Sequence, residues 1–217
     1  MTYKELVNSV LVRLREEQIV NVTDNSYSTL IGEFVNDAKR QVEDAWNWTA
    51  LRQTLTVTTT ANTFNYEMNG AGTRFRVLDV INDTSNFFME QQTSKWFDDR
   101  FLNPSSAVET GEPRNYTFNG VSSDGDIQVD IYPIPDTTYS LRFNFVIPQA
   151  KLTENTTELL VPSEPVILGA YARAVAERGE DGGLTSAEAF ALAANSLSDA
   201  IAIEANHFPS ELIWNEV

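Results

Sequence analysis

The first fifty residues place their apolar side chains with the period of an α-helix. Within residues 3–18 the apolar positions recur every three or four residues and form one stripe, made of Leu6, Val7, Val10, Leu11 and Leu14. Thr2 and Glu5 have the spacing of a capping box at its start. A second stripe predicts a helix over residues 28–46, and consists of Leu30, Ile31, Phe34, Val35, Ala38, Val42 and Trp46.

From residue 51 the period changes to two, and β-branched and aromatic residues dominate. Alternation of this kind, interrupted by Asn69-Gly70 and Asp124-Gly125, predicts strands joined by tight turns. The predicted strands are 51–58, 62–67, 74–81, 86–91, 114–119, 126–132 and 139–147. Residues 94–102 are an exception, because they predict a short helix with Ser94 as its N-cap that ends before Pro104.

The helical period returns after Val161. Residues 164–178 form the third long helix of the prediction, with Ser163 as N-cap and Pro165 in the first turn. Gly179 suits its C-terminal end. A fourth helix is predicted over residues 185–206, and its alanine-rich face would allow close approach to another helix. The spacing of Thr185 and Glu188 again indicates a capping box.

The chain therefore reads as two helices, a β block and two further helices. Neither helical pair can bury its apolar stripe alone, so we expect the two pairs to pack together. The predicted fold is α+β, with a four-helix bundle built from the N- and C-terminal helix pairs and an inserted antiparallel β domain. Its parts are residues 1–50 (N-terminal helix pair), 51–161 (β domain), 162–206 (C-terminal helix pair) and 207–217 (C-terminal tail).

The C-terminal tail is unusually apolar for a terminal segment. Termini commonly carry small polar residues, whereas this one contains Phe208, Leu212, Ile213 and Trp214. The segment either folds back on its own bundle or inserts into a partner. Tryptophan is strongly enriched among binding hot spots, which favours docking to a partner, so these four residues are the predicted binding site.

The composition excludes several kinds of catalytic and metal site. The 217 residues include no cysteine and one histidine, His207, so thiolate and multi-histidine metal sites cannot form. Asp98 and Asp99 are adjacent on a short helix and diverge, and Asp124, Asp126 and Asp130 lack the glycine and closing glutamate of a calcium loop. No phosphate-binding loop or nucleophile elbow is present. We therefore expect no enzyme, and no catalytic, cofactor-binding or metal-binding residue.

The net charge is −16, with an isoelectric point near 4.3. An acidic surface argues against holding a nucleic-acid backbone. It keeps a protein soluble, and it would also suit a conduit through which DNA slides. There is no signal peptide and no apolar run of about 18 residues, so we expect synthesis in a cytoplasm and no membrane association.

Several runs along the chain resemble the head-to-tail adaptor, or connector, family of tailed bacteriophages. They are Gly111–Tyr116, Asp126–Asp136, Tyr139–Phe143, Trp46–Trp48, and Leu159–Pro162 before the alanine-rich helix pair. The resemblance covers nearly the whole chain and is one of pattern and order, with no single diagnostic motif. In one departure, Tyr66 is followed by Glu67-Met68-Asn69 where the family often has Tyr-x-Leu-Pro, which puts the local turn in question.

The resemblance implies a structural virion protein of the neck, between head and tail. Such proteins form a homo-oligomeric ring, commonly of 12 copies, that joins the portal protein to the tail or nozzle proteins. Genomic DNA would pass through the channel without specific binding, the C-terminal segment would climb onto the portal, and no cofactor is implied. Two alternatives remain: a tail-completion or tail-tube subunit, and a carbohydrate-binding module that uses aromatic residues such as Tyr116, Phe118 and Tyr132.

Overall fold

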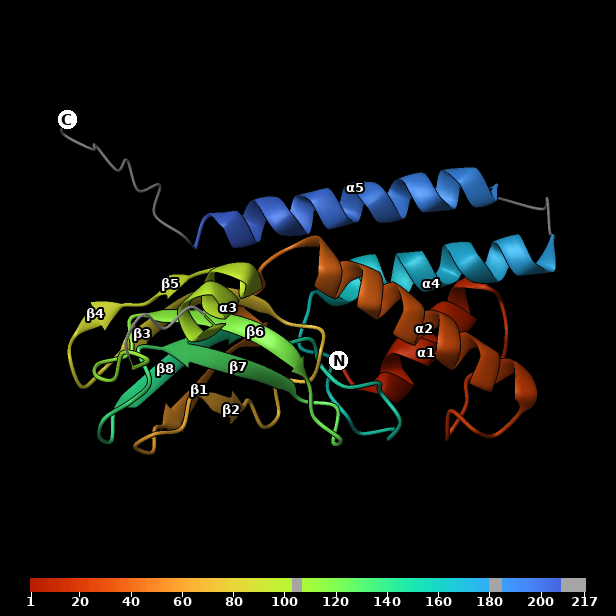
Figure 1. Cartoon of the computed structure of the whole chain (residues 1–217). Helices are drawn as coiled ribbons and strands as arrows, with labels where there is room; N and C mark the ends of the chain where they lie inside the picture. The colour runs from red at the N-terminus through yellow and green to blue at the C-terminus, as the bar shows by residue number, and fades with distance from the viewer. Residues whose placement is uncertain (103–106, 180–184, 208–217) are drawn as a thin grey trace. The chain divides into compact units, whose positions relative to one another are not determined.

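The computed structural model describes residues 1–102, 107–179 and 185–207, and contains helices and strands in the predicted order (Figure 1). The helices are α1 (Tyr3–Arg13), α2 (Ser26–Ala45), α3 (Ser94–Leu102), α4 (Ser163–Arg178) and α5 (Ser186–Ala205), with a 3-10 turn at Thr49–Leu51. The strands are β1 (Arg52–Thr58), β2 (Asn65–Glu67), β3 (Arg76–Asn82), β4 (Phe87–Phe88), β5 (Glu90–Gln91), β6 (Asn115–Val121), β7 (Ile127–Tyr132) and β8 (Ser140–Val146). The α+β class is confirmed.

The chain divides into two compact units. The helical unit comprises Met1–Leu51 and Gln149–Val217, and the β unit comprises Arg52–Pro148. The sequence placed residues 149–161 in the β domain, whereas the structure has them in the helical unit. There they run beside the N-terminus, with the Tyr3 N–H donating to Thr157 O at 2.9 Å and the Leu159 N–H donating to Met1 O at 2.9 Å.

Side-chain caps start three of the helical unit's helices. Capping boxes are present at Thr2 for α1, at Asn25 for α2 and at Thr185 for α5, and each satisfies N–H groups that a helix start leaves without partners. The N-cap predicted at Ser163 is wrong. Pro162 occupies the cap of α4 and makes no side-chain hydrogen bond, because Ser163 is already helical.

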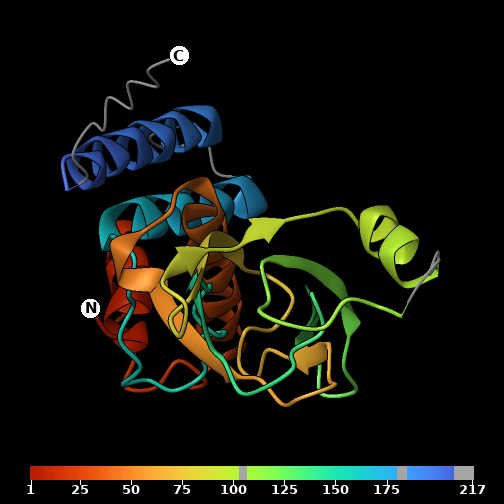
Figure 2. The same cartoon turned by 60° about the vertical axis from the view of Figure 1, so that its left-hand side comes forward.

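Three helices of this unit pack on one another, and the fourth lies outside them. α1, α2 and α4 are in mutual contact, whereas α5 packs chiefly along α4, as Figures 1 and 2 both show. Gly169 allows α2 and α4 to approach closely, since a Cβ at this position would lie 3.2 Å from Ala38 Cβ. The predicted four-helix bundle is therefore not confirmed.

The β unit is built from two sheets. Their strand orders are β1-β8-β3-β4 and β2-β7-β6-β5. All pairings are antiparallel except β5 with β6, which is parallel. The single strand predicted over 86–91 is in fact two short ones, and β4 and β5 join different sheets. The chain thus crosses between the sheets at Met89.

The core of the β unit is made of apolar side chains from both sheets. Its largest buried members are Phe143 and Phe145 of β8, which pack with Val80, Tyr116, Val129, Ile131 and Leu141. Alternate residues of β8 point inward, as its buried Leu141, Phe143 and Phe145 show. This is the period-two alternation that the sequence displays.

α3 packs on the sheet through aromatic side chains. The rings of Trp96, Phe97 and Phe101 lie 5.4, 6.4 and 5.9 Å from that of Tyr132 in β7, all edge-to-face, a favoured geometry for aromatic pairs. The N-cap predicted at Ser94 is wrong by one residue, because the Trp96 N–H donates to Thr93 Oγ1 at 3.2 Å.

Candidate assembly interface

α5 keeps several large apolar side chains exposed. Phe190, Leu192 and Ile203 are 43, 44 and 66% exposed, and Ala189 is the helix's one buried apolar residue among those described. Exposed apolar side chains mark an interaction site when they form a contiguous patch. α5 is therefore the first element to consider as a surface for assembly.

A groove runs between α5 and the two helices beneath it. The space within it that solvent can enter is about 90 Å³, and its walls come from α2, α4 and α5. The lining residues are Ala38, Gln41, Val42, Pro165, Gly169, Arg173, Phe190, Ala193, Ala194 and Leu197. Most are apolar and many are small, so the groove is a shallow apolar hollow on the helical unit.

Arg173 is the charged residue at this groove. Its Nη1 donates to Gly169 O at 3.0 Å, one turn earlier in α4, and its Nη2 donates to Gln41 Oε1 of α2 at 3.0 Å. These two bonds fix the guanidinium at the mouth of the groove. The site therefore combines apolar walls with a held positive charge.

The C-terminal part of the chain carries charge of one sign. No lysine or arginine follows Arg178, whereas seven acidic residues do. On α5 the acidic residues are Glu188, Asp199 and Glu204. Surfaces that α5 and the tail contact should therefore be apolar or basic, since like charges repel across an interface.

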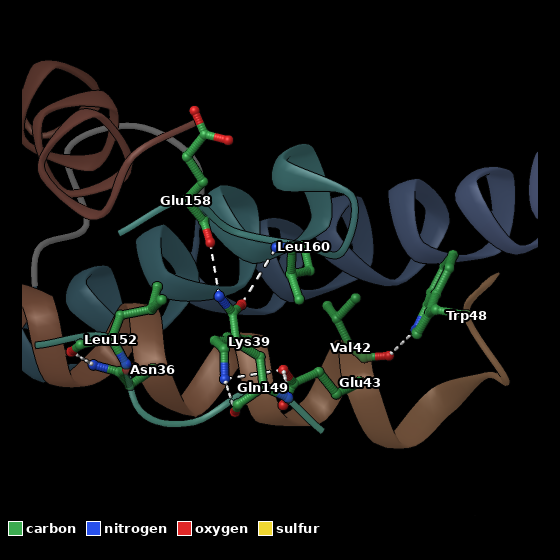
Figure 3. Close-up of polar contacts among 9 residues, drawn as sticks. All are labelled: Asn36, Lys39, Val42, Glu43, Trp48, Gln149, Leu152, Glu158 and Leu160. Atoms are coloured by element: carbon green, nitrogen blue, oxygen red, sulfur yellow. Dashed lines mark hydrogen bonds and ion pairs between the residues drawn. The ribbon is translucent and has the colours of Figure 1, made fainter. Parts of the chain in front are cut away.

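A buried ion pair anchors α2 to the segment that returns from the β unit (Figure 3). Lys39 Nζ lies 2.9 Å from Glu43 Oε1, with the two side chains 4 and 1% exposed. Lys39 Nζ also donates to Gln149 O at 2.6 Å, and the Gln149 N–H donates to Glu43 Oε1 at 3.1 Å. We call Lys39, Glu43 and Gln149 the clamp. Hydrogen bonds to both charges offset the cost of burying them.

Two further side chains extend the contacts of the clamp. Asn36 exchanges two hydrogen bonds with the backbone of Leu152, at 3.1 Å and 2.8 Å. Trp48 is fully buried, and its Nε1 donates to Val42 O at 2.7 Å. Trp48 therefore serves core packing. The spacing of Asn36, Lys39 and Glu43, three and four residues apart on one face of α2, was the available sequence signal for this network.

The carboxylates considered as catalytic candidates have structural partners or point to solvent. Asp98, Asp99 and Asp124 are exposed. Asp126 accepts from the N–H groups of Gly70 and Gly72 at 3.0 and 2.8 Å, which lowers the pKa of its carboxyl.

Asp130 is the one buried member of this set. It accepts from the side-chain amides of Asn65 and Asn119 at 2.6 and 2.7 Å. Both bonds join β7 to its neighbours, β2 and the end of β6. The arrangement therefore stabilises the sheet.

His207 lies just beyond the end of α5. Its Nδ1 is 3.3 Å from Glu204 Oε2. Burial raises the pKa of Glu204, but hydrogen bonds from Thr49 and the nearby His207 outweigh it and lower the pKa overall. Over the three described ranges, no cluster of three or more histidine, aspartate or glutamate side chains could hold a metal ion, and no helix is long and apolar enough to cross a membrane.

The aromatic residues that suggested carbohydrate binding lie inside the β unit. Tyr116 and Tyr132 are buried and Phe118 is half-buried. Tyr116 packs edge-to-face on Phe143 at 6.1 Å, and Phe118 lies 6.3 Å from Phe145. A sugar-binding platform needs exposed rings, so the observation that motivated this alternative is wrong.

The predicted binding site itself lies outside the described residues. Phe208, Leu212, Ile213 and Trp214 all follow His207, where the described chain ends. Their contacts are therefore not established, and the tail stays a prediction.

No curated protein sequence matches this chain. A family model does match it: that of the SU10 adaptor protein, over residues 1–210. The match covers both units, and it agrees with the resemblance seen in the sequence. The chain therefore belongs to the SU10 adaptor protein family, a family of phage head-to-tail adaptors.

Proposed function

We propose that this protein forms a ring at the neck of a tailed-phage virion, joining the portal to the tail and continuing the DNA channel. Family membership supports a structural adaptor role in the virion, in association with portal and tail components. The resemblance of the sequence adds the expectation of about 12 copies. The single observation that carries the proposal is the family match across residues 1–210.

The charge of the chain supports a channel role. With a net charge of −16, most orientations of the subunit would present acidic surface to a lumen. Acidic walls repel phosphate, and so DNA would slide without being held. The same negative charge would repel the phosphates of DNA and so weaken binding to it.

The exposed surfaces of the helical unit support assembly. A cyclic ring needs two different patches on each subunit, one for each neighbour. α5 offers an apolar, acidic surface, and the α2–α4 side carries Arg40 and Arg173 beside Asp37 and Asp44. These surfaces differ in character, as heterologous contacts require.

The tail is proposed to attach the subunit to the portal. Deletion of Phe208–Val217 should abolish attachment and leave the subunit folded, because the buried apolar residues of both units precede the tail in the chain. Trp214→Ala should weaken attachment by about 2 kcal/mol or more if Trp214 is a hot spot. Saturation of portal rings by the truncated protein would contradict the docking role.

The experiment that tests the proposal is native mass spectrometry of the protein alone and mixed with portal rings of the same phage. A subunit that adds to the portal in a fixed multiple supports the adaptor ring. A protein that stays free of portals but binds tail tubes would instead assign it to tail completion.

A further inference from the structure

The groove between α2, α4 and α5 has the properties of a docking site for the chain's own tail. Its wall is mostly apolar, several of its lining residues are small, and Arg173 is fixed beside it. We propose that in the unassembled subunit the tail folds back and seats Trp214 in this groove. The proposal rests on the proposed function for one step, the later transfer of the tail to the portal.

The length of the tail fits this site. Ala194 lies thirteen residues before His207 on α5, which is about 20 Å along a helix at 1.5 Å per residue. Trp214 follows His207 by seven residues, and an extended chain spans about 23 Å over that length. An extended tail that starts at His207 is therefore long enough for Trp214 to reach Ala194 on α5.

The chemistry of the tail also fits. Trp214 is flanked by Glu211 and Glu216, and the groove offers the guanidinium of Arg173 at its mouth. A tryptophan between acidic residues thus meets apolar walls beside a positive charge. Covering a large aromatic side chain removes apolar surface from water.

The fold-back would solve a problem for the free subunit. Four large apolar residues at the terminus would otherwise be exposed before assembly, and exposed apolar surface promotes aggregation. A groove that holds the tail weakly keeps the subunit soluble. A portal that binds the tail more tightly then draws it out.

The test uses the four tryptophans of the full-length protein, Trp46, Trp48, Trp96 and Trp214. We would label them with 5-fluorotryptophan, assign the Trp214 resonance with Trp214→Phe, and measure its shift between H2O and D2O. Ala194→Glu places a carboxylate in the groove, and Ala191→Glu is the matched control, because both alanines are exposed on α5 but only Ala194 lines the groove.

The expected result is a small solvent shift for Trp214 in the wild type and in Ala191→Glu, and a shift at least twofold larger in Ala194→Glu. The value should be unchanged over a tenfold dilution, because the contact is within one chain. A wild-type Trp214 with the full solvent shift would overturn the proposal. A small shift that is lost on dilution would overturn it in favour of a second copy.

The link to the portal has a separate readout. Ala194→Glu should attach to portal rings several-fold faster than Ala191→Glu, because its tail is already released. Equal rates would overturn the transfer step. The fluorine result does not involve the portal, so failure of the proposed function leaves it interpretable.

Discussion

The β unit completes its own core, whereas the helical unit leaves one helix half-covered. In the β unit two sheets enclose Phe143 and Phe145, and the short helix α3 closes over Tyr132 with three aromatic rings. In the helical unit α5 packs on α4 and exposes Phe190, Leu192 and Ile203. The β unit also exposes single apolar side chains, such as Phe88 at 70%, so the contrast concerns the closed core of one unit and the partly covered helix of the other.

Both units bury an apolar core, and the helical unit adds a buried ion pair. This ion pair and its hydrogen bonds hold the returning segment to α2. Directional polar contacts specify one position for a segment more tightly than apolar contacts do. The clamp thus fixes the chain at the point where the β unit ends and the helical unit resumes.

The largest expected effect tests the completeness of the β core. Phe143→Ala should lower the free energy of unfolding by about 4 kcal/mol, because it removes a fully buried ring and leaves a cavity. Urea denaturation followed by circular dichroism measures the change. Phe88→Ala, which removes an exposed ring of the same unit, is the control, and equal losses would contradict a closed core.

A slightly smaller effect tests the clamp. Glu43→Ala should cost about 3 kcal/mol, because it leaves the Lys39 ammonium buried without its carboxylate. The double variant Lys39→Met, Glu43→Leu should recover much of that loss, since it removes both charges. Urea denaturation of the single and double variants distinguishes these cases, and a double variant as unstable as the single one would show that shape, not charge pairing, matters here.

The capping box of α5 predicts a modest, pH-dependent effect. Thr185→Ala should cost about 1 kcal/mol at pH 7. Hydrogen bonds from Thr185 to the Glu188 carboxylate lower the pKa of Glu188. The contribution of the carboxylate is therefore present above the unfolded pKa of about 4.3 and is lost as the pH falls through the lower folded value.

The direction of the Glu188 pKa shift can be tested by removing the charge of this side chain. Glu188→Gln should be less stable than the wild type at pH 6, and the difference should shrink toward pH 3 as the Glu188 carboxylate takes up its proton. Thermal unfolding at the two pH values reports it. A difference that persists at pH 3 would mean that the amide disturbs the helix start by another route.

The smallest expected change in the free energy of unfolding tests directly whether α5 is less well packed than the core of the β unit. Ile203→Ser should change the free energy of unfolding by no more than about 0.5 kcal/mol, because Ile203 is 66% exposed. Chemical denaturation beside Phe143→Ala gives the contrast. A loss of 2 kcal/mol or more would show that α5 is packed in the free subunit and that the helical unit is as closed as the β unit.

Local patterns predicted most of the secondary structure. The capping boxes at Thr2 and Thr185 are confirmed, and Gly179 does end α4 in a left-handed conformation, with φ of 65°. Two of the errors fell where neighbouring residues compete for a cap. Thr93 and not Ser94 caps α3, and Pro162 and not Ser163 caps α4. Such choices depend on backbone direction rather than on propensity.

The candidate site was harder to predict than the fold. The tail residues were singled out by their apolar character alone, and their contacts remain to be measured. The sequence did not predict the clamp, because Lys39 and Glu43 have the i,i+4 spacing that is common for exposed ion pairs on a helix. Only the return of residues 149–152 along α2, more than a hundred positions later, makes that pair buried.

The sequence by itself determined the order of the elements, the α+β class and the exclusion of cysteine and multi-histidine chemistry, because each follows from local period or composition. It also carried the family resemblance. The tertiary structure alone decided that α5 lies outside the other helices, that residues 149–161 belong to the helical unit and that Tyr116 and Tyr132 are buried. These outcomes depend on contacts between residues that are far apart in the chain. The free energies of such contacts cannot be predicted from local sequence patterns.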